Sequence, residues 1–205
     1  STNGQVSGRR NIVINGAMNV AQRSASVTGL GATAGYHTLD RFRASLTDTA
    51  GRFTMSQTAD GPSGFANCLK LDCTTADASI AATEQLTILQ RIEGQDLQQF
   101  KKGTSDAEYF TVSFYVKANA SATYVLELFD NDNSRQISKL FNVTNSWSSV
   151  VLTFPPDTTG AFDDDNATSL TLSFQLHLGS NFTSGTLNTT AWASNTNANR
   201  AAGID

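Results

Sequence analysis

The chain is short of the residue types that bind metals or form cross-links. Its 205 residues include two histidines and two cysteines, too few soft ligands for a structural zinc site. Cys68 and Cys73 share one stretch that reads as a strand, where their odd separation puts them on opposite faces, about 16 Å apart. That distance is too long for a disulfide. Both are therefore expected to be free thiols, as in a reducing compartment.

The chain is also poor in charge. Charged residues make up 16% of it and the formal net charge is −4, whereas an average globular protein has about 25% charged residues. No stripe of Lys and Arg stands out, so nucleic acid is not an expected partner. No stretch reaches the roughly 18 consecutive apolar residues of a membrane helix, so membrane insertion is not expected either.

What the chain does have is Thr, Ser and Asn in alternation with apolar residues. The alternation is clearest at 109–116 and at 170–178, and a period of two predicts half-buried strands. The segment 79–92 stays open between helix and strand, and 96–101 is typical of a single helical turn. Further strands are predicted at 11–15, 39–44, 52–57, 67–72, 124–129, 136–143 and 149–154.

Short polar turns separate these strands, and no long helix intervenes. This pattern predicts an all-β fold, an antiparallel jelly-roll-like β-sandwich in one domain. We place the domain at 9–187, with an N-terminal lead-in at 1–8 and a polar C-terminal segment at 188–205.

Motifs of known catalysts are missing from the sequence. The stretch Gly61-Pro62-Ser63-Gly64 lacks the spacing of a nucleophile elbow. A glycosidase needs a pair of carboxyl groups, and the chain has four glutamates in all. Of these, Glu127 is the candidate to line a concave sheet and contact a ligand; the alternative is a polar residue satisfied within the sheet. We predict that the protein is not an enzyme and needs no cofactor.

Two acidic loops are candidates for a hard cation such as Ca²⁺, which prefers oxygen ligands. One contains Asp163, Asp164 and Asp165, and the other is Asp130-Asn131-Asp132. Adjacent acidic residues in turns are usually only solvated, so the main prediction is that the protein holds no metal, with a structural calcium as the alternative.

Aromatic side chains are the candidate ligand contacts, because a flat ring with a polar handle can stack on the apolar face of a sugar. The candidates for ligand binding are Trp147, Trp192 and Tyr124, together with Glu127. Tyr36 and Tyr115 are further aromatics of this kind. Packing in the core or at a subunit contact is the alternative for each of them.

Several stretches, in order along the chain, resemble a known family. They are RNIVINGAM at 10–18, AQR at 21–23, YHTLDRF at 36–42, QRIEG at 90–94, VSFYVK at 112–117 and DTTG at 157–160. This set is similar to the landmarks of a bacteriophage virion-protein family found in tail fibres and other appendages. The resemblance covers about residues 9 to 187.

The resemblance implies a β-sandwich like that of carbohydrate-binding modules, without catalytic residues. It implies a virion location after assembly in the bacterial cytoplasm, with other virion proteins and a host-surface polysaccharide as partners. The alternative is a purely structural capsid, tail or fibre-assembly component with no ligand of its own. A homotrimer or other homo-oligomer is expected. Family members continue into a further strand, so we expect the closing strand to be either missing from this chain or supplied by a neighbouring subunit.

Overall fold

The computed structural model describes residues 11–204, and the regular secondary structure of this part of the chain is almost entirely β-strand. Its helices are one short α-helix and three 3₁₀ turns: α1 (Ser180–Thr183), η1 (Gly94–Asp96), η2 (Gln98–Phe100) and η3 (Asn197–Asn199). Within the described residues, no helix is long and apolar enough to cross a membrane. The strands are β1 (Ser26–Leu30), β2 (Arg43–Thr47), β3 (Arg52–Thr58), β4 (Cys68–Thr75), β5 (Gln85–Glu93), β6 (Phe110–Val116), β7 (Ala122–Asp130), β8 (Arg135–Val143), β9 (Ser148–Phe154), β10 (Thr168–Leu178) and β11 (Ala193–Ser194).

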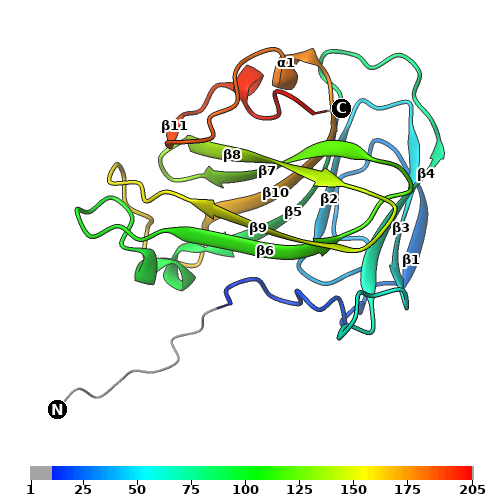
Figure 1. The fold of residues 1–205 in the computed structure, drawn as a ribbon, viewed down its shortest axis with the longest axis horizontal. Coiled ribbons are helices and arrows are strands. Elements are labelled where there is room, and N and C mark those ends of the chain that lie inside the picture. Colours follow the sequence, from blue (N-terminus) through cyan, green and yellow to red (C-terminus); the bar gives the residue numbers. More distant parts are fainter. Residues whose placement is uncertain (1–10, 205) are drawn as a thin grey trace.

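The strands form two packed layers. One layer is a six-stranded sheet in the order β11-β8-β7-β10-β5-β2. The other layer is divided into the pair β6-β9 and the three-stranded sheet β1-β3-β4, which lie side by side in Figure 1. Every pairing is antiparallel, so the predicted all-β antiparallel sandwich is confirmed.

The jelly-roll part of the prediction has partial support in the pairing pattern. The pair β7-β8 is nested inside β6-β9, which is nested inside β5-β10, as in a rolled-up hairpin. The sheet β1-β3-β4 stands outside this nest, so a complete jelly-roll topology is not established.

Two of the hydrophobic clusters of the interior join into one core, and a smaller third cluster of Leu178, Phe182 and Ala201 lies apart. A large cluster lies between the six-stranded sheet and β6-β9, and includes Leu126, Leu128 and Phe154. A second cluster lies under β1-β3-β4. Val13 and Phe174 pack against both clusters and join them. Burial of apolar side chains between the layers is what holds the two parts of the second layer to the same sheet.

Two predicted strands in the first fifth of the chain are wrong in whole or in part. Residues 11–15 form a loop and turn, because Asn15 adopts a left-handed φ of 59° and its amide donates to the carbonyl oxygens of Val20 and Asp40. The strand predicted at 39–44 begins only at Arg43, since Arg41 is also left-handed, at φ 72°. The ambiguous segment 79–92 contributes β5 from Gln85 onward, and β1 was not predicted.

Strand β10 is buried on both faces, so the prediction of a half-buried strand is wrong there. Ser173 and Gln175, which alternate with the leucines, are 2% and 1% exposed. The strand sits between β7 and β5 in the middle of the large sheet. Part of the sheet's polar face is covered by the C-terminal segment, whose backbone accepts hydrogen bonds from Gln136 and Ser138.

Candidate ligand-binding surface

The two-stranded sheet β6-β9 turns one face to the core and the other to solvent. The strands pair along their whole length, from Phe110 opposite Phe154 to Val116 opposite Ser148. Because successive side chains point to opposite faces, the inward set is apolar apart from Ser148, while the outward set is exposed and mostly hydroxyl-bearing. We call the outward set the β6–β9 outer face; it comprises Thr111, Ser113, Tyr115, Ser149, Val151 and Thr153.

Exposed aromatic rings stand at both ends of the β6 side of this face. Tyr115 and Phe65 are 48% and 42% exposed, and their ring centroids lie 5.7 Å apart with the planes inclined by 55°. Tyr109 is 63% exposed and immediately precedes β6. It stands two positions before Thr111, so the alternation of the strand, continued by one residue, puts its ring on the outer face. A protein rarely leaves neighbouring large apolar surfaces uncovered unless they bind something.

Beyond Tyr115, the outer face ends at a charged pair that is already neutralised. Lys117 forms an ion pair with Asp60, and its ammonium group lies 5.2 Å from the centroid of the Trp147 ring. Trp147 is partly buried, and its indole nitrogen has no hydrogen-bond partner among the described residues. Trp147 therefore borders the outer face, with its ring covered by the lysine.

At the opposite end, before β6 begins, the surface is hollowed. A recess of about 390 Å³ lies between the segment that follows η1 and the loop before β10. The segment 101–106 forms one wall and leads directly into Tyr109 and β6. The recess is lined by Leu97, Gln98, Lys101, Lys102, Thr104, Asp106, Ala161 and Phe162.

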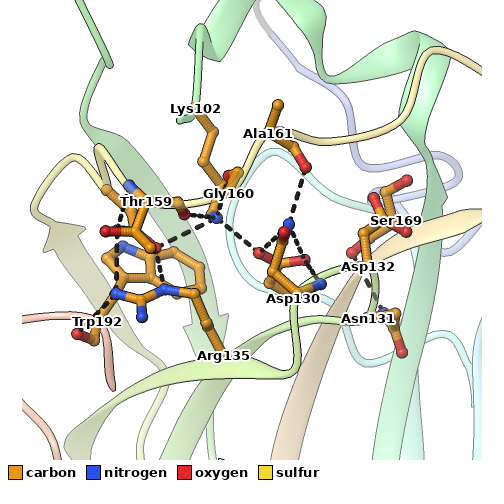
Figure 2. Close-up of polar contacts among 12 residues, drawn as sticks. Lys102, Asp130, Asn131, Asp132, Arg135, Thr159, Gly160, Ala161, Ser169 and Trp192 are labelled. Carbon is orange, nitrogen blue, oxygen red and sulfur yellow. Dashed lines mark hydrogen bonds and ion pairs between the residues drawn. The ribbon is translucent and has the colours of Figure 1, made fainter. Parts of the chain in front are cut away.

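Beneath the recess, the Lys102 ammonium group is enclosed in a cage of oxygen atoms (Figure 2). It lies 2.6 Å from Asp130 Oδ2 and 3.2 Å from Asp157 Oδ2, and it donates to the carbonyl oxygens of Thr159 and Gly160 at 2.9 and 2.8 Å. The side chains of Lys102 and Asp130 are 0% exposed. A buried lysine is tolerated only when it is paired and hydrogen-bonded, and this one is held by two separate segments of the chain, Asp130 and the loop 157–160.

The cage extends to a second cation, Arg135. Its guanidinium donates two hydrogen bonds to Asp157, at 2.7 and 3.1 Å, the fork geometry of a strong charge-assisted pair. Burial alone would raise the pKa of Asp157, but the hydrogen bond from Arg135, the backbone N–H of Thr159 and the Lys102 charge outweigh it and hold that pKa below its ordinary value. Asp157 is therefore ionised at neutral pH, and two carboxylates face two cations.

The loop that closes the cage depends on a glycine. Gly160 has a φ of 69° and passes so close to Asn133 that a Cβ at this position would lie 2.3 Å from that side chain. Asn133 in turn donates to both carboxylate oxygens of Asp130. A side chain at position 160 would therefore both strain the backbone and displace a ligand of the cage.

The acidic loops predicted as calcium candidates are used differently. Asp130 faces the Lys102 ammonium, so a protein cation already neutralises that carboxylate. Asp132 accepts a hydrogen bond from the backbone of Asp163, and Asp165 accepts one from the backbone of Ala167. Within residues 11–204, no three acidic, His or Cys side chains gather in a way that would hold a metal ion, and Asp163, Asp164 and Asp165 form no such group.

The four predicted ligand contacts are scattered, and only Trp147 borders the outer face. Trp192 is 6% exposed and its indole N–H donates to the carbonyl oxygen of Pro155. Tyr124 lies on the inner side of β7, beside the Phe141 ring. Trp192 is therefore buried, which corrects its assignment to a solvent-facing role, and Tyr124 is partly buried against the core.

Glu127 is fully buried and is satisfied within the sheet. It accepts hydrogen bonds from Gln175 and from two nitrogens of Arg200. Burial alone would lower the pKa of Arg200, but the hydrogen bonds and charge of Glu127 raise it. The alternative of a polar residue satisfied by its neighbours describes Glu127; it is not a ligand contact on an open sheet face.

The exposed rings of Tyr109 and Phe65 were not among the ligand contacts predicted from the sequence. Tyr109 had a signal, since it continues the alternation of Thr111 and Ser113 beyond the end of the strand. No sequence pattern indicated that Phe65 is exposed, because it lies in a Gly- and Ser-rich loop without the periodicity that would predict the direction of a side chain.

The comparisons with known proteins give no family for this chain. No protein-family model matches it, and a search of curated proteins finds no significant match.

Proposed function

We propose that the protein is a non-enzymatic recognition module of a bacteriophage tail fibre or similar appendage, and that it binds a host-surface glycan through the β6–β9 outer face. The observation that carries the binding role is the exposed, uncharged face with the uncovered rings of Tyr115 and Phe65. Rings of this kind stack on the apolar C–H faces of sugars, and the neighbouring hydroxyl groups can hydrogen-bond the sugar hydroxyls.

The virion assignment is supported by the resemblance of the ordered landmarks between residues 10 and 160 to the phage appendage family. The buried carboxylates support the part of the proposal that the protein is not an enzyme. Glu127, Asp130 and Asp157 are each paired with a Lys or Arg side chain, whereas a hydrolase keeps its carboxyl groups accessible to substrate.

Binding of the labelled, purified protein to intact candidate host cells tests the proposal, with extracted surface polysaccharide as competitor. We expect saturable binding that the polysaccharide inhibits. Replacing Tyr115 with Ala should weaken binding by about 1–2 kcal/mol, roughly 5- to 30-fold. Tyr36→Ala is the matched control, because Tyr36 is also exposed but lies outside the outer face.

Two results would contradict the proposal. Absence of binding by a folded sample of the correct oligomeric state would favour the purely structural virion component. Burial of Tyr115 at a contact between subunits, detected as loss of its accessibility on oligomerisation, would point the same way, because the outer face would then serve assembly.

A further inference from the structure

The β6–β9 outer face is long compared with a single sugar. Tyr109 is the exposed residue before β6, and continuing the alternation of the strand by one residue puts it on the side of Tyr115. The two tyrosines are six positions apart, which corresponds to about 20 Å at 3.3 Å per residue. Thr111 and Ser113 lie between them, both exposed, so aromatic rings mark the two ends and hydroxyl groups line the middle. A ligand that uses both rings must extend along the strand.

The strip between the two tyrosines carries no charge. On β9, the residues opposite the outward positions of β6 are Ser149, Val151 and Thr153, and Thr111 and Thr153 share a hydrogen bond across the strands. The nearest cation beyond Tyr115 is Lys117, which is neutralised by Asp60. An anionic ligand would find no free positive partner along this strip, whereas an uncharged ligand would leave no buried charge unpaired.

The recess lies beside the segment that precedes Tyr109 in the chain. Its wall from Lys101 to Asp106 leads into β6. The charged residues of the lining are Lys101, Asp106 and Lys102, and the charge of Lys102 is neutralised in the cage. Leu97 and Phe162 give it an apolar lining next to the polar groups of Gln98 and Thr104. A concave site with an apolar lining and a few polar groups is the usual form of a small-ligand pocket.

Resting on the proposed function, we infer that the ligand is an uncharged polysaccharide chain bound lengthwise along β6. Several consecutive sugars lie between the recess and the Phe65–Tyr115 pair. The recess receives the sugar at one end of the bound segment, Tyr109 and Tyr115 stack on sugars near the two ends, and the hydroxyl groups of Thr111 and Ser113 contact the sugars between them.

Calorimetric titration with graded fragments tests this inference. The probe is the polysaccharide that competes in the cell-binding assay, partially hydrolysed and separated by size from one sugar to fragments longer than the strip. We expect affinity to rise with fragment length by about 10-fold or more over the disaccharide and then to level off once a fragment spans both tyrosines. Tyr109→Ala and Tyr115→Ala should each weaken binding of the long fragments, and together roughly additively, because the two sites are far apart. Tyr36→Ala should change nothing.

The charge of the ligand is tested by salt and by competition. Raising NaCl well above physiological concentration should change the affinity by less than about 2-fold, because no ion pair forms with the ligand. A polyanionic glycan such as heparin should not compete.

Each contrary result has a separate meaning. Equal affinity for the disaccharide and the long fragments, or sensitivity to Tyr115→Ala without sensitivity to Tyr109→Ala, would overturn the lengthwise chain and leave glycan recognition standing. A steep loss of affinity with salt would overturn the uncharged ligand. Failure of the intact polysaccharide to bind at all would overturn the proposed function together with this inference.

Discussion

Replacement of Lys102 by Met tests the idea that the cage of oxygens around the ammonium group holds the loops of the sandwich in place. The substitution keeps much of the side chain's length and removes its charge. Asp157 would keep its two hydrogen bonds from Arg135. Asp130 would keep only the neutral donors of Asn133, so one fully buried carboxylate would lose its counter-charge.

The expected loss of stability follows from the contacts that Asp130 would lose. Removing one partner of a buried ion pair costs about 3–5 kcal/mol, because it leaves the other charge buried without compensation. With a urea m-value of about 2 kcal/mol/M, a loss of 4 kcal/mol lowers the unfolding midpoint by about 2 M. Urea denaturation followed by tryptophan fluorescence measures this shift, and Trp192 beside Lys102 reports on the site itself.

Two further variants keep the experiment decisive. Lys70→Met removes an exposed lysine whose ion pair with Asp72 is about half accessible on both sides, and it should cost less than about 1 kcal/mol. The double variant Lys102→Met with Asp130→Asn removes the uncompensated charge, so it should be more stable than Lys102→Met alone, even if the single variant does not fold. A loss below about 1 kcal/mol for Lys102→Met, or no recovery in the double variant, would refute the role assigned to the cage.

Three other predictions concern the groups around the cage and the sheet. The pKa of Asp157 lies below its ordinary value in the folded protein, so its stabilisation is complete above about pH 5 and is lost as the pH falls through the folded pKa. Urea denaturation at several pH values should show a steeper loss of stability below about pH 5 for the wild type than for Asp157→Asn. Glu127→Gln should cost about 2–3 kcal/mol, because Arg200 loses its counter-charge, and hydrogen exchange should then accelerate in residues 195–204. Gly160→Ala should lower the free energy of unfolding by about 2 kcal/mol through backbone strain and overpacking. Gly16→Ala is the control and should cost little, because a Cβ at that position would come no closer than 3.6 Å to its neighbours. Equal shifts of the melting temperature for the two variants would contradict this prediction.

The sequence alone predicts the strands that have one solvent-exposed face and one buried face. β6 and β9 alternate apolar and hydroxyl residues because one side faces the core and the other solvent, so their pattern carries their environment. β10 has the same alternation, yet its polar side chains are buried, because small Ser and Thr residues fit equally well under a covering segment and in water. The cover over this face is the C-terminal segment, which follows β10 along the chain, and the alternation within β10 gives no sign of it.

The cage could not be predicted, since its members come from distant parts of the chain. Lys102 follows another lysine, and nothing in the local sequence says that Lys101 is exposed while its neighbour is fully buried. The sequence marks Asp130 as part of an acidic loop that is either solvated or, as the alternative, a calcium site, and neither interpretation points to a lysine 28 positions earlier. Charged residues without periodicity give no sign of their partners.

The two ends of the proposed binding strip are held by contacts of different strength, and this difference has a consequence for binding. The recess end rests on the cage, whose ion pairs are buried and little screened by solvent. At the other end, the Phe65 loop is tied to β6 by the exposed pair of Asp60 and Lys117, and exposed pairs contribute about 0–1 kcal/mol. Ordering that loop on binding costs part of the energy gained from the ring, while Tyr115 is fixed by the strand. Phe65→Ala should therefore weaken glycan binding less than Tyr115→Ala, although the two rings are similarly exposed; a larger effect at Phe65 would mean that its loop is already rigid before the ligand arrives.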